Sequence, residues 1–95
     1  MGLYVLVCID KPGALELRRA TRAAHLAYAG EHRAMLRLAG PFLDEAGEMA
    51  GSLFILEADD LAAAQAFHAA DPYRLAGLFE RVEIRPWRAT VGEVP

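Results

Sequence analysis

Long hydrophobic segments, an excess of basic residues and paired cysteines are all missing from this sequence, and each absence excludes a class of protein. No apolar run approaches the roughly 18 residues that are needed to cross a bilayer. The net charge is −3, which does not suit a nucleic-acid binder, since such proteins carry a basic patch. One cysteine cannot form an intrachain disulfide, and the first residues lack the basic start of a signal peptide, so we expect a cytoplasmic protein that does not bind membranes.

What the sequence does contain is sufficient for one small globular domain. The chain has 95 residues, and 55% of them are hydrophobic, which excludes disorder. We therefore treat residues 1–95 as a single domain, with a core at about 2–88 and a C-terminal tail at 89–95.

Apolar runs and turn residues follow one another in an order that predicts an α+β fold. Strands are expected where β-branched and aromatic residues gather, and helices where strong helix formers predominate. Pro41 favours an edge strand or a bulge, and Asp59 or Asp60 is suited to cap the second helix. The predicted strands are 3–9, about 36–43, 51–58 and 78–87, and the predicted helices are 14 to about 36 and 61–70, with a short turn near 73–77. Gly30 either ends the first of these helices or only weakens it. This β-α-β-β-α-β order is the ferredoxin-like arrangement, a four-stranded antiparallel sheet with two helices on one face.

Two of the predicted strands are apolar on both faces, although two helices can cover only one face of the sheet. Residues 3–9 and 53–56 would leave a contiguous hydrophobic patch in water. The simplest cover is a second copy of the chain, because two-fold pairs are the commonest oligomers. We therefore expect a homodimer that pairs through its sheet faces.

Three histidines, His25, His32 and His68, are the candidate acids or bases. Each is also compatible with a surface or packing role. His25 and His32 lack the i, i+4 spacing of helical metal pairs, so we expect no metal and no cofactor.

Asp71 allows two interpretations. It precedes Pro72, so it is suited to cap a short helix, and its carboxylate is equally suited to orient an imidazole.

Other polar and small residues leave alternatives open. Gly40 fits a bulge or a close backbone approach, and Ser52 fits an ordinary strand start or a hydroxyl donor. The arginines of the first helix form a solvated face or attract an anion, and Cys8 behaves as a small hydrophobe. These arginines are Arg18, Arg19 and Arg22.

The chain resembles the YciI-like, or YCII-related, family of small bacterial proteins over roughly residues 2–88. The resemblance rests on the order and spacing of several short segments. They are Leu3-Tyr4-Val5-Leu6, Arg22-Ala23-Ala24-His25-Leu26, Ala39-Gly40-Pro41, Gly51-Ser52, Ala70-Asp71-Pro72-Tyr73, Ala76-Gly77-Leu78 and Ile84-Arg85-Pro86-Trp87.

The resemblance implies a ferredoxin-like fold that dimerises as an α+β barrel, with an active site built around His25 and Asp71. The positions around that site correspond to Arg22, Gly40, Pro41, Ser52 and Tyr73, whereas His32 and His68 match nothing in the pattern. A related member is a dehydrochlorinase of a chlorinated hydroxyhydroquinone, and fold relatives include muconolactone isomerases and cofactor-free monooxygenases. Fold analogy of this kind does not assign a substrate.

We therefore expect a small cofactor-free enzyme that uses His25 and Asp71 for general acid–base chemistry on a small aromatic or lactone-like substrate. The reaction would be a proton transfer, an elimination or an isomerisation. The alternative is a non-catalytic homodimer that binds or senses a small molecule, or a stable dimer with a vestigial site.

Overall fold

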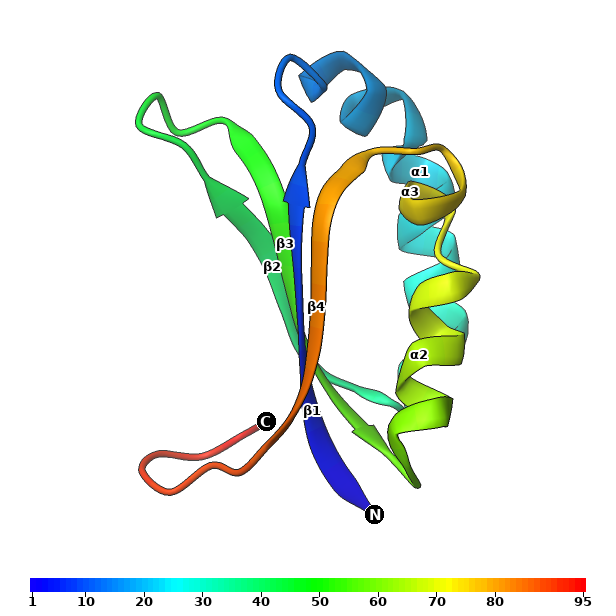
Figure 1. Ribbon diagram of the computed structural model, residues 1–95, viewed down its shortest axis with the longest axis vertical. Coiled ribbons are helices and arrows are strands. Elements are labelled where there is room, and N and C mark those ends of the chain that lie inside the picture. The colour runs from blue at the N-terminus through cyan, green and yellow to red at the C-terminus, as the bar shows by residue number, and fades with distance from the viewer.

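The computed structural model describes residues 1–95 and contains four strands and three helices (Figure 1). In chain order they are β1 (Gly2–Asp10), α1 (Leu15–Glu31), β2 (Leu36–Leu43), β3 (Met49–Ala58), α2 (Leu61–Ala69), α3 (Pro72–Leu75) and β4 (Phe79–Trp87). The short α3 replaces the turn that the sequence predicts there.

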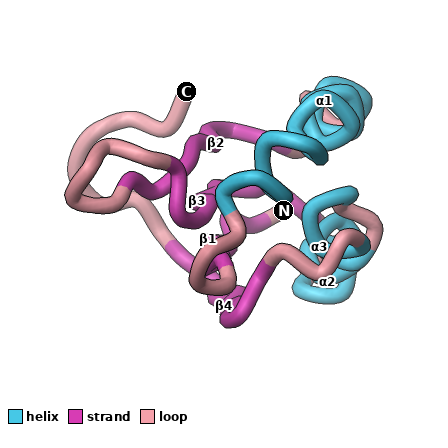
Figure 2. Tube along the Cα trace, turned by 90° about the horizontal axis from the view of Figure 1, so that it is seen from above, coloured by secondary structure: helices cyan, strands magenta, loops and turns pink.

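The strands form one antiparallel sheet in the order β2-β3-β1-β4, and all three helices lie against the same face (Figure 2). This is the ferredoxin-like architecture predicted from the sequence. The edge position of β2 agrees with Pro41, because proline cannot donate a ladder hydrogen bond. The two irregularities of β2 fall at Leu36/Leu38 and at Phe42/Leu43, so the bulge considered at Gly40 is not found there.

The core lies between the sheet and the helices. Leu6 and Cys8 from β1 pack with Phe54 and Leu56 from β3, and Phe67 from α2 closes this cluster. The strand register explains the arrangement, because Leu6 is paired with Phe54 and side chains along a strand alternate between faces.

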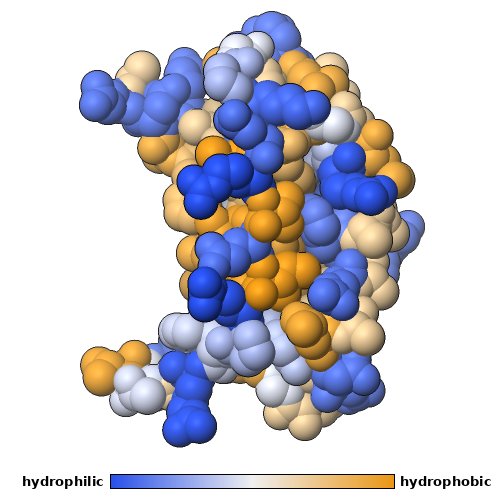
Figure 3. Space-filling model, viewed as in Figure 1, coloured by the Kyte–Doolittle hydropathy of each residue, from blue (hydrophilic) through white to orange (hydrophobic).

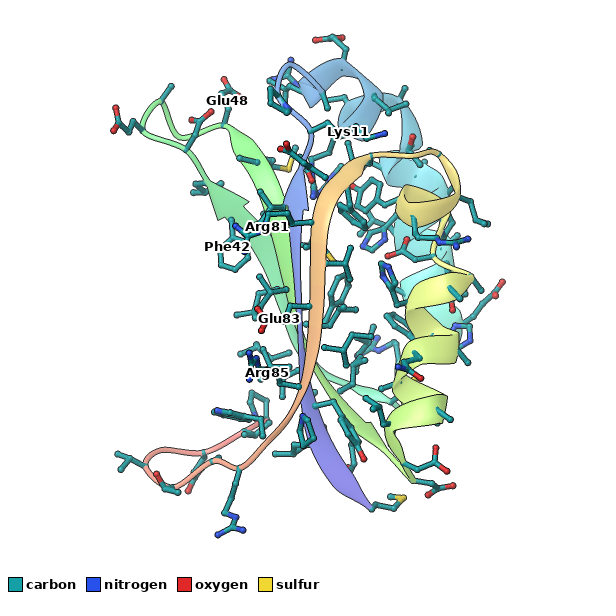
Figure 4. All side chains as sticks on the ribbon, in the orientation of Figure 1. Lys11, Phe42, Glu48, Arg81, Glu83 and Arg85 are labelled. Carbon is teal, nitrogen blue, oxygen red and sulfur yellow. The ribbon has the colours of Figure 1, made fainter.

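The alternate side chains form the open sheet face, which no helix covers. Most of its apolar residues come from the three neighbouring strands β1, β3 and β2, and most of its charged residues come from β4. In Figure 4, Phe42, Arg81, Glu83 and Arg85 lie on the side of the sheet opposite the helices. Figure 3 sees the sheet from its edge and shows hydrophobic residues in the middle of the molecule bordered by hydrophilic ones. The open sheet face consists of Leu3, Val5, Val7, Ile9, Leu38, Phe42, Leu53, Ile55, Glu57, Arg81, Glu83, Arg85 and Trp87.

The first helix, α1, ends at Glu31, next to Gly30, which is the earlier of the two ends that the sequence allows. The N–H of His32 bonds the carbonyl of Ala29, while the Nδ1–H of His32 donates to the carbonyl of Tyr28 at 2.9 Å. This side chain takes the carbonyl that one more helical turn would have used, so the helix ends there. No helix in the chain is both long enough and apolar enough to cross a membrane.

Candidate active site

A pocket of about 240 Å³ lies between α1, α3 and the β2–β3 side of the sheet. Leu26, Ala29, Met49 and Phe54 give it apolar walls. All of the predicted site residues except Asp71 line it, namely Arg22, His25, Gly40, Pro41, Ser52 and Tyr73. The fold thus brings together residues that are far apart in the sequence, while their catalytic and binding roles stay predictions.

His25 and Asp71 form a buried hydrogen bond at the inner wall of this pocket. The Nδ1 atom of His25 lies 2.8 Å from Oδ1 of Asp71, and because a carboxylate accepts, Nδ1 carries the hydrogen. The His25 side chain is 11% exposed and Asp71 is fully buried. Since Asp71 occupies Nδ1, the nitrogen left for a ligand is Nε2, and Asp71 acts from behind the imidazole without lining the pocket.

The two interpretations of Asp71 hold at the same time. Oδ1 also accepts the N–H of Tyr73 at 2.9 Å, so the same oxygen caps α3 and orients His25. The other oxygen, Oδ2, is buried and has no hydrogen-bond partner. The helix cap therefore fixes the carboxylate in the position from which it reaches the imidazole.

Tyr73 and Phe54 hold the imidazole from two sides. The Tyr73 ring stacks on His25 with its centroid 4.1 Å away and an interplanar angle of 16°, and Phe54 meets His25 edge-on at 5.8 Å. Burial raises the pKa of Tyr73, so its hydroxyl keeps its proton at neutral pH. These contacts leave His25 little freedom to leave the geometry set by Asp71.

Arg18 is buried, and this corrects the prediction that it belongs to an exposed basic cluster. Its guanidinium donates to both carboxylate oxygens of Asp10, at 2.7 and 2.9 Å, and to Oγ of Ser52 at 2.8 Å. It also lies over the Tyr73 ring, 4.6 Å from the centroid.

Sequence reasoning missed Arg18 and Asp10 as members of the site, although one signal was available. Arg18 precedes His25 by two helical turns, so a helix that turns His25 inward also turns Arg18 inward. These are the two buried residues of α1, and both are polar.

The other two arginines of the predicted cluster are exposed and differ from each other. Arg19 pairs with Glu16 and Glu48 at 3.3 and 3.1 Å. Arg22 makes no hydrogen bond or ion pair with the chain and lies at the pocket, one helical turn from His25. An exposed arginine without an acidic partner is compatible with both alternatives that the sequence left for this cluster, a solvated face and an anion-binding residue.

The remaining candidates lie outside the pocket. His32 bonds the end of α1, and His68 lies under Phe79 with its Nδ1 atom buried and unpartnered. Burial, with a smaller effect of Asp71, raises the pKa of the Cys8 thiol to about 12, which agrees with its interpretation as a small hydrophobe. No three His, Cys, Asp or Glu side chains are grouped so as to hold a metal ion.

The fold and the pocket together define a small ferredoxin-like α+β domain with a buried histidine–carboxylate pair beside a small cavity. The sequence model of the YCII-related domain matches residues 2–88, and the chain belongs to this family. It is 39% identical to Protein YciI of Escherichia coli O6:H1 over 90% of this chain and 96% of that protein.

Solved structures agree with this assignment. The 5-chloro-2-hydroxyhydroquinone dehydrochlorinase TftG of Burkholderia phenoliruptrix AC1100, solved with 2,5-dihydroxybenzoquinone, superposes with a TM-score of 0.86. It is 32% identical, with 93% of this chain and 95% of that one covered. A structure of an antibiotic biosynthesis monooxygenase, 15% identical with a TM-score of 0.57 and 96% of this chain and 100% of that one covered, shares the fold alone.

Proposed function

We propose that the protein is a small-molecule enzyme that moves a proton on a compact, anionic, oxygenated ring by general acid–base catalysis. The observation that carries this proposal is the 2.8 Å bond between His25 Nδ1 and Asp71 Oδ1, with the imidazole at the wall of a pocket. An imidazole held in one tautomer by a buried carboxylate is suited to accept a proton and to return it.

In the proposed mechanism, Nε2 of His25 takes a proton from the bound ring and the imidazolium is stabilised by Asp71. In an isomerisation, the imidazolium returns this proton to another atom of the same ring. In an elimination, a leaving group departs with its electron pair, and the proton passes to water. Acid–base assistance of this kind contributes about 10²–10⁴-fold to a rate, which suits an activated ring.

The pocket favours a small ligand that carries negative charge. Its volume of about 240 Å³ lies below the ~300–1,000 Å³ typical of sites for drug-sized molecules. Its free charged group is Arg22, and half of its lining residues are hydrophobic, as suits one ring with an ionised oxygen. The likeness to TftG supports this class, because that structure holds 2,5-dihydroxybenzoquinone.

Turnover of 5-chloro-2-hydroxyhydroquinone by the wild-type protein and by His25→Gln tests the proposal, with His32→Gln as the matched control. We expect chloride release by the wild type and the control, and a loss of at least about 100-fold in His25→Gln. The affinity of each variant for 2,5-dihydroxybenzoquinone is measured in parallel by calorimetry. A protein that binds 2,5-dihydroxybenzoquinone but turns over neither 5-chloro-2-hydroxyhydroquinone nor any of a panel of phenolic and lactone acids would support the alternative, a non-catalytic binding protein.

The charge of the ligand is tested separately by Arg22→Gln, with Arg33→Gln as the control. Both arginines are exposed and unpaired, but only Arg22 lines the pocket. We expect Arg22→Gln to weaken binding of 2,5-dihydroxybenzoquinone about three- to tenfold at low salt, with a smaller difference in 0.5 M salt. Equal effects of the two substitutions would contradict a role for Arg22 in binding.

We also propose that a second copy of the chain covers the open sheet face. Only 16 of the 95 residues are buried in one copy, and on this face Leu38 is 50% exposed while Val5, Val7 and Leu53 are half-buried, so a partner would bury apolar surface that one copy leaves in water. Charge complementarity supports a copy as the partner, because Arg81, Glu83 and Arg85 alternate in sign along β4. Within one copy Glu83 pairs with Arg85, and a two-fold axis that passes between Arg81 and Glu83 would bring Glu83 of one copy toward Arg81 of the other.

A further inference from the structure

We infer that Arg18, held by Asp10, positions the Ser52 hydroxyl as the hydrogen-bond donor to an anionic oxygen of the bound ligand. The inference rests on the proposed function only for the class of the ligand. Arg18 also lines the pocket, and it is a positioning residue in this arrangement because its Nε and Nη2 atoms are bonded to Asp10 and Ser52.

The three side chains form a closed and buried network. The Arg18 guanidinium uses Nε and Nη2 to hold both oxygens of Asp10, and Nη2 also reaches Ser52 Oγ at 2.8 Å. Exposure is 2% for Arg18, 9% for Asp10 and 4% for Ser52. The planar guanidinium therefore has its direction fixed by two bonds to one carboxylate, and that direction places the Ser52 oxygen.

The direction of the Ser52 hydrogen follows from the chemistry of its neighbour. A guanidinium donates and cannot accept, so Ser52 Oγ is the acceptor in this bond. The hydroxyl hydrogen must find another acceptor, and no group of the chain accepts it. Ser52 lines the pocket, so a ligand atom is the acceptor this hydrogen can reach there. Donation from a cation also polarises the hydroxyl and makes it a stronger donor.

Stability alone is a weak reason for this network. Desolvation offsets most of the attraction in a buried ion pair, and well-packed apolar residues are often as stable. Arg18 and His25 face the same way from α1 and both contact Tyr73, 4.6 and 4.1 Å from its ring centroid. One face of α1 therefore places His25, the proposed base, and Arg18, which holds Ser52, beside the Tyr73 ring.

The pocket as a whole then offers donors to an acceptor-rich ligand. Asp10 is fully bonded to Arg18 and Asp71 lies behind His25, so no carboxylate lines the pocket. Arg22 and the Ser52 hydroxyl are left to bind oxygens, and His25 is left to exchange a proton. An ionised hydroxyquinone or phenolate satisfies all three groups.

Calorimetric titration with 2,5-dihydroxybenzoquinone tests the inference on Ser52→Ala, on the charge-neutral pair Asp10→Asn/Arg18→Gln, and on the triple variant. The pair is changed together so that no buried charge is left unpaired. We expect Ser52→Ala to bind at least about tenfold more weakly, the pair to lose a similar factor, and the triple variant to lose no more than Ser52→Ala. Ser52→Thr, which keeps the hydroxyl, should bind within about threefold of the wild type.

Three results would overturn the inference: wild-type affinity in Ser52→Ala, losses that multiply in the triple variant, or no binding of the probe to the wild type. If the neutral pair does not fold, Arg18→Lys replaces it, because an ammonium keeps the charge near Asp10 but lacks the fork that also reaches Ser52. Failure of the proposed function gives a different result. In that case no turnover is seen, while probe binding still depends on Ser52 and Arg18 and is retained in His25→Gln.

Discussion

At the residue scale, the carboxylate of Asp71 serves two neighbours with one oxygen. Oδ1 accepts from His25 Nδ1 and from the N–H of Tyr73, and Oδ2 has no partner. This asymmetry makes Asp71→Asn an unusually clean substitution. The Tyr73 N–H requires an acceptor, so it orients the new amide with its oxygen at the Oδ1 position.

We therefore expect Asp71→Asn to keep the Nδ1–H tautomer of His25 and to lose only the negative charge that stabilises the imidazolium. Turnover should fall by about 10²-fold, because the loss lies in the charged intermediate. Nitrogen-15 NMR of the imidazole reports the tautomer, and chloride release reports the rate. A change to the Nε2–H tautomer, or an unaltered rate, would contradict this account.

His68 connects a buried ring to the pH dependence of stability. Burial lowers its pKa from the ordinary 6.5, so the folded state resists protonation there more than the unfolded state does. As pH falls through about 6.5, the unfolded state binds the proton first and stability decreases. We expect the wild type to lose more stability than His68→Gln between about pH 7 and pH 5, measured by urea unfolding at each pH. Parallel curves for the two proteins would count against this role of His68.

At the element scale, the side chain of Asp60 caps the start of α2, and the side chain of the preceding Asp59 does not. The carboxylate of Asp60 accepts the N–H of Ala63 at 2.9 Å, whereas Asp59 makes no such bond. Asp60→Ala should lower the free energy of unfolding by about 1 kcal/mol, and Asp59→Ala should change it by less than about 0.5 kcal/mol. Urea denaturation of both variants measures the difference, and equal losses would show that the cap does not stabilise α2.

The elements also show what a single sequence can and cannot predict. The four strands and their order followed from local composition, because apolar β-branched runs between turn residues carry that information locally. The end of α1 is predictable only as a range from Gly30 to about Leu36, because the exact residue depends on where the His32 side chain turns. The sequence favours an exposed Arg18, as a solvated or anion-attracting residue, because an arginine on a helix is usually exposed, whereas its partners Asp10 and Ser52 come from β1 and β3.

The site was predictable to the extent that it copies a family pattern. His25, Asp71 and the residues around the pocket were named from the resemblance and from their chemistry, and the structure brings them together. The family pattern does not specify which oxygen of Asp71 faces which neighbour, nor that Arg18 and Asp10 hold Ser52. Those features depend on three-dimensional register, which becomes visible only when the strands and α1 are placed side by side.

At the scale of the whole molecule, the open sheet face predicts association. We expect the wild type to have about twice the monomer mass of 10.3 kDa by light scattering at micromolar concentration. Val7→Lys should shift the protein to the monomer, because it puts a charge among the apolar residues of that face without touching the helix-side core. Val91→Lys, at a residue that is 94% exposed, is the control and should leave the mass unchanged. A monomeric wild type would contradict the proposed homodimer.

The reactivity of the buried Cys8 thiol can report how often the interior beside the site opens. With its pKa raised to about 12 and its side chain shut between sheet and helices, Cys8 reacts with a thiol reagent only in molecules that have opened. The labelling rate in native buffer therefore measures how often the layer that holds His25 and Asp71 opens. A ligand that stabilises the folded state slows this labelling, so the labelling rate of Cys8 reports whether a compound from a screen binds the protein.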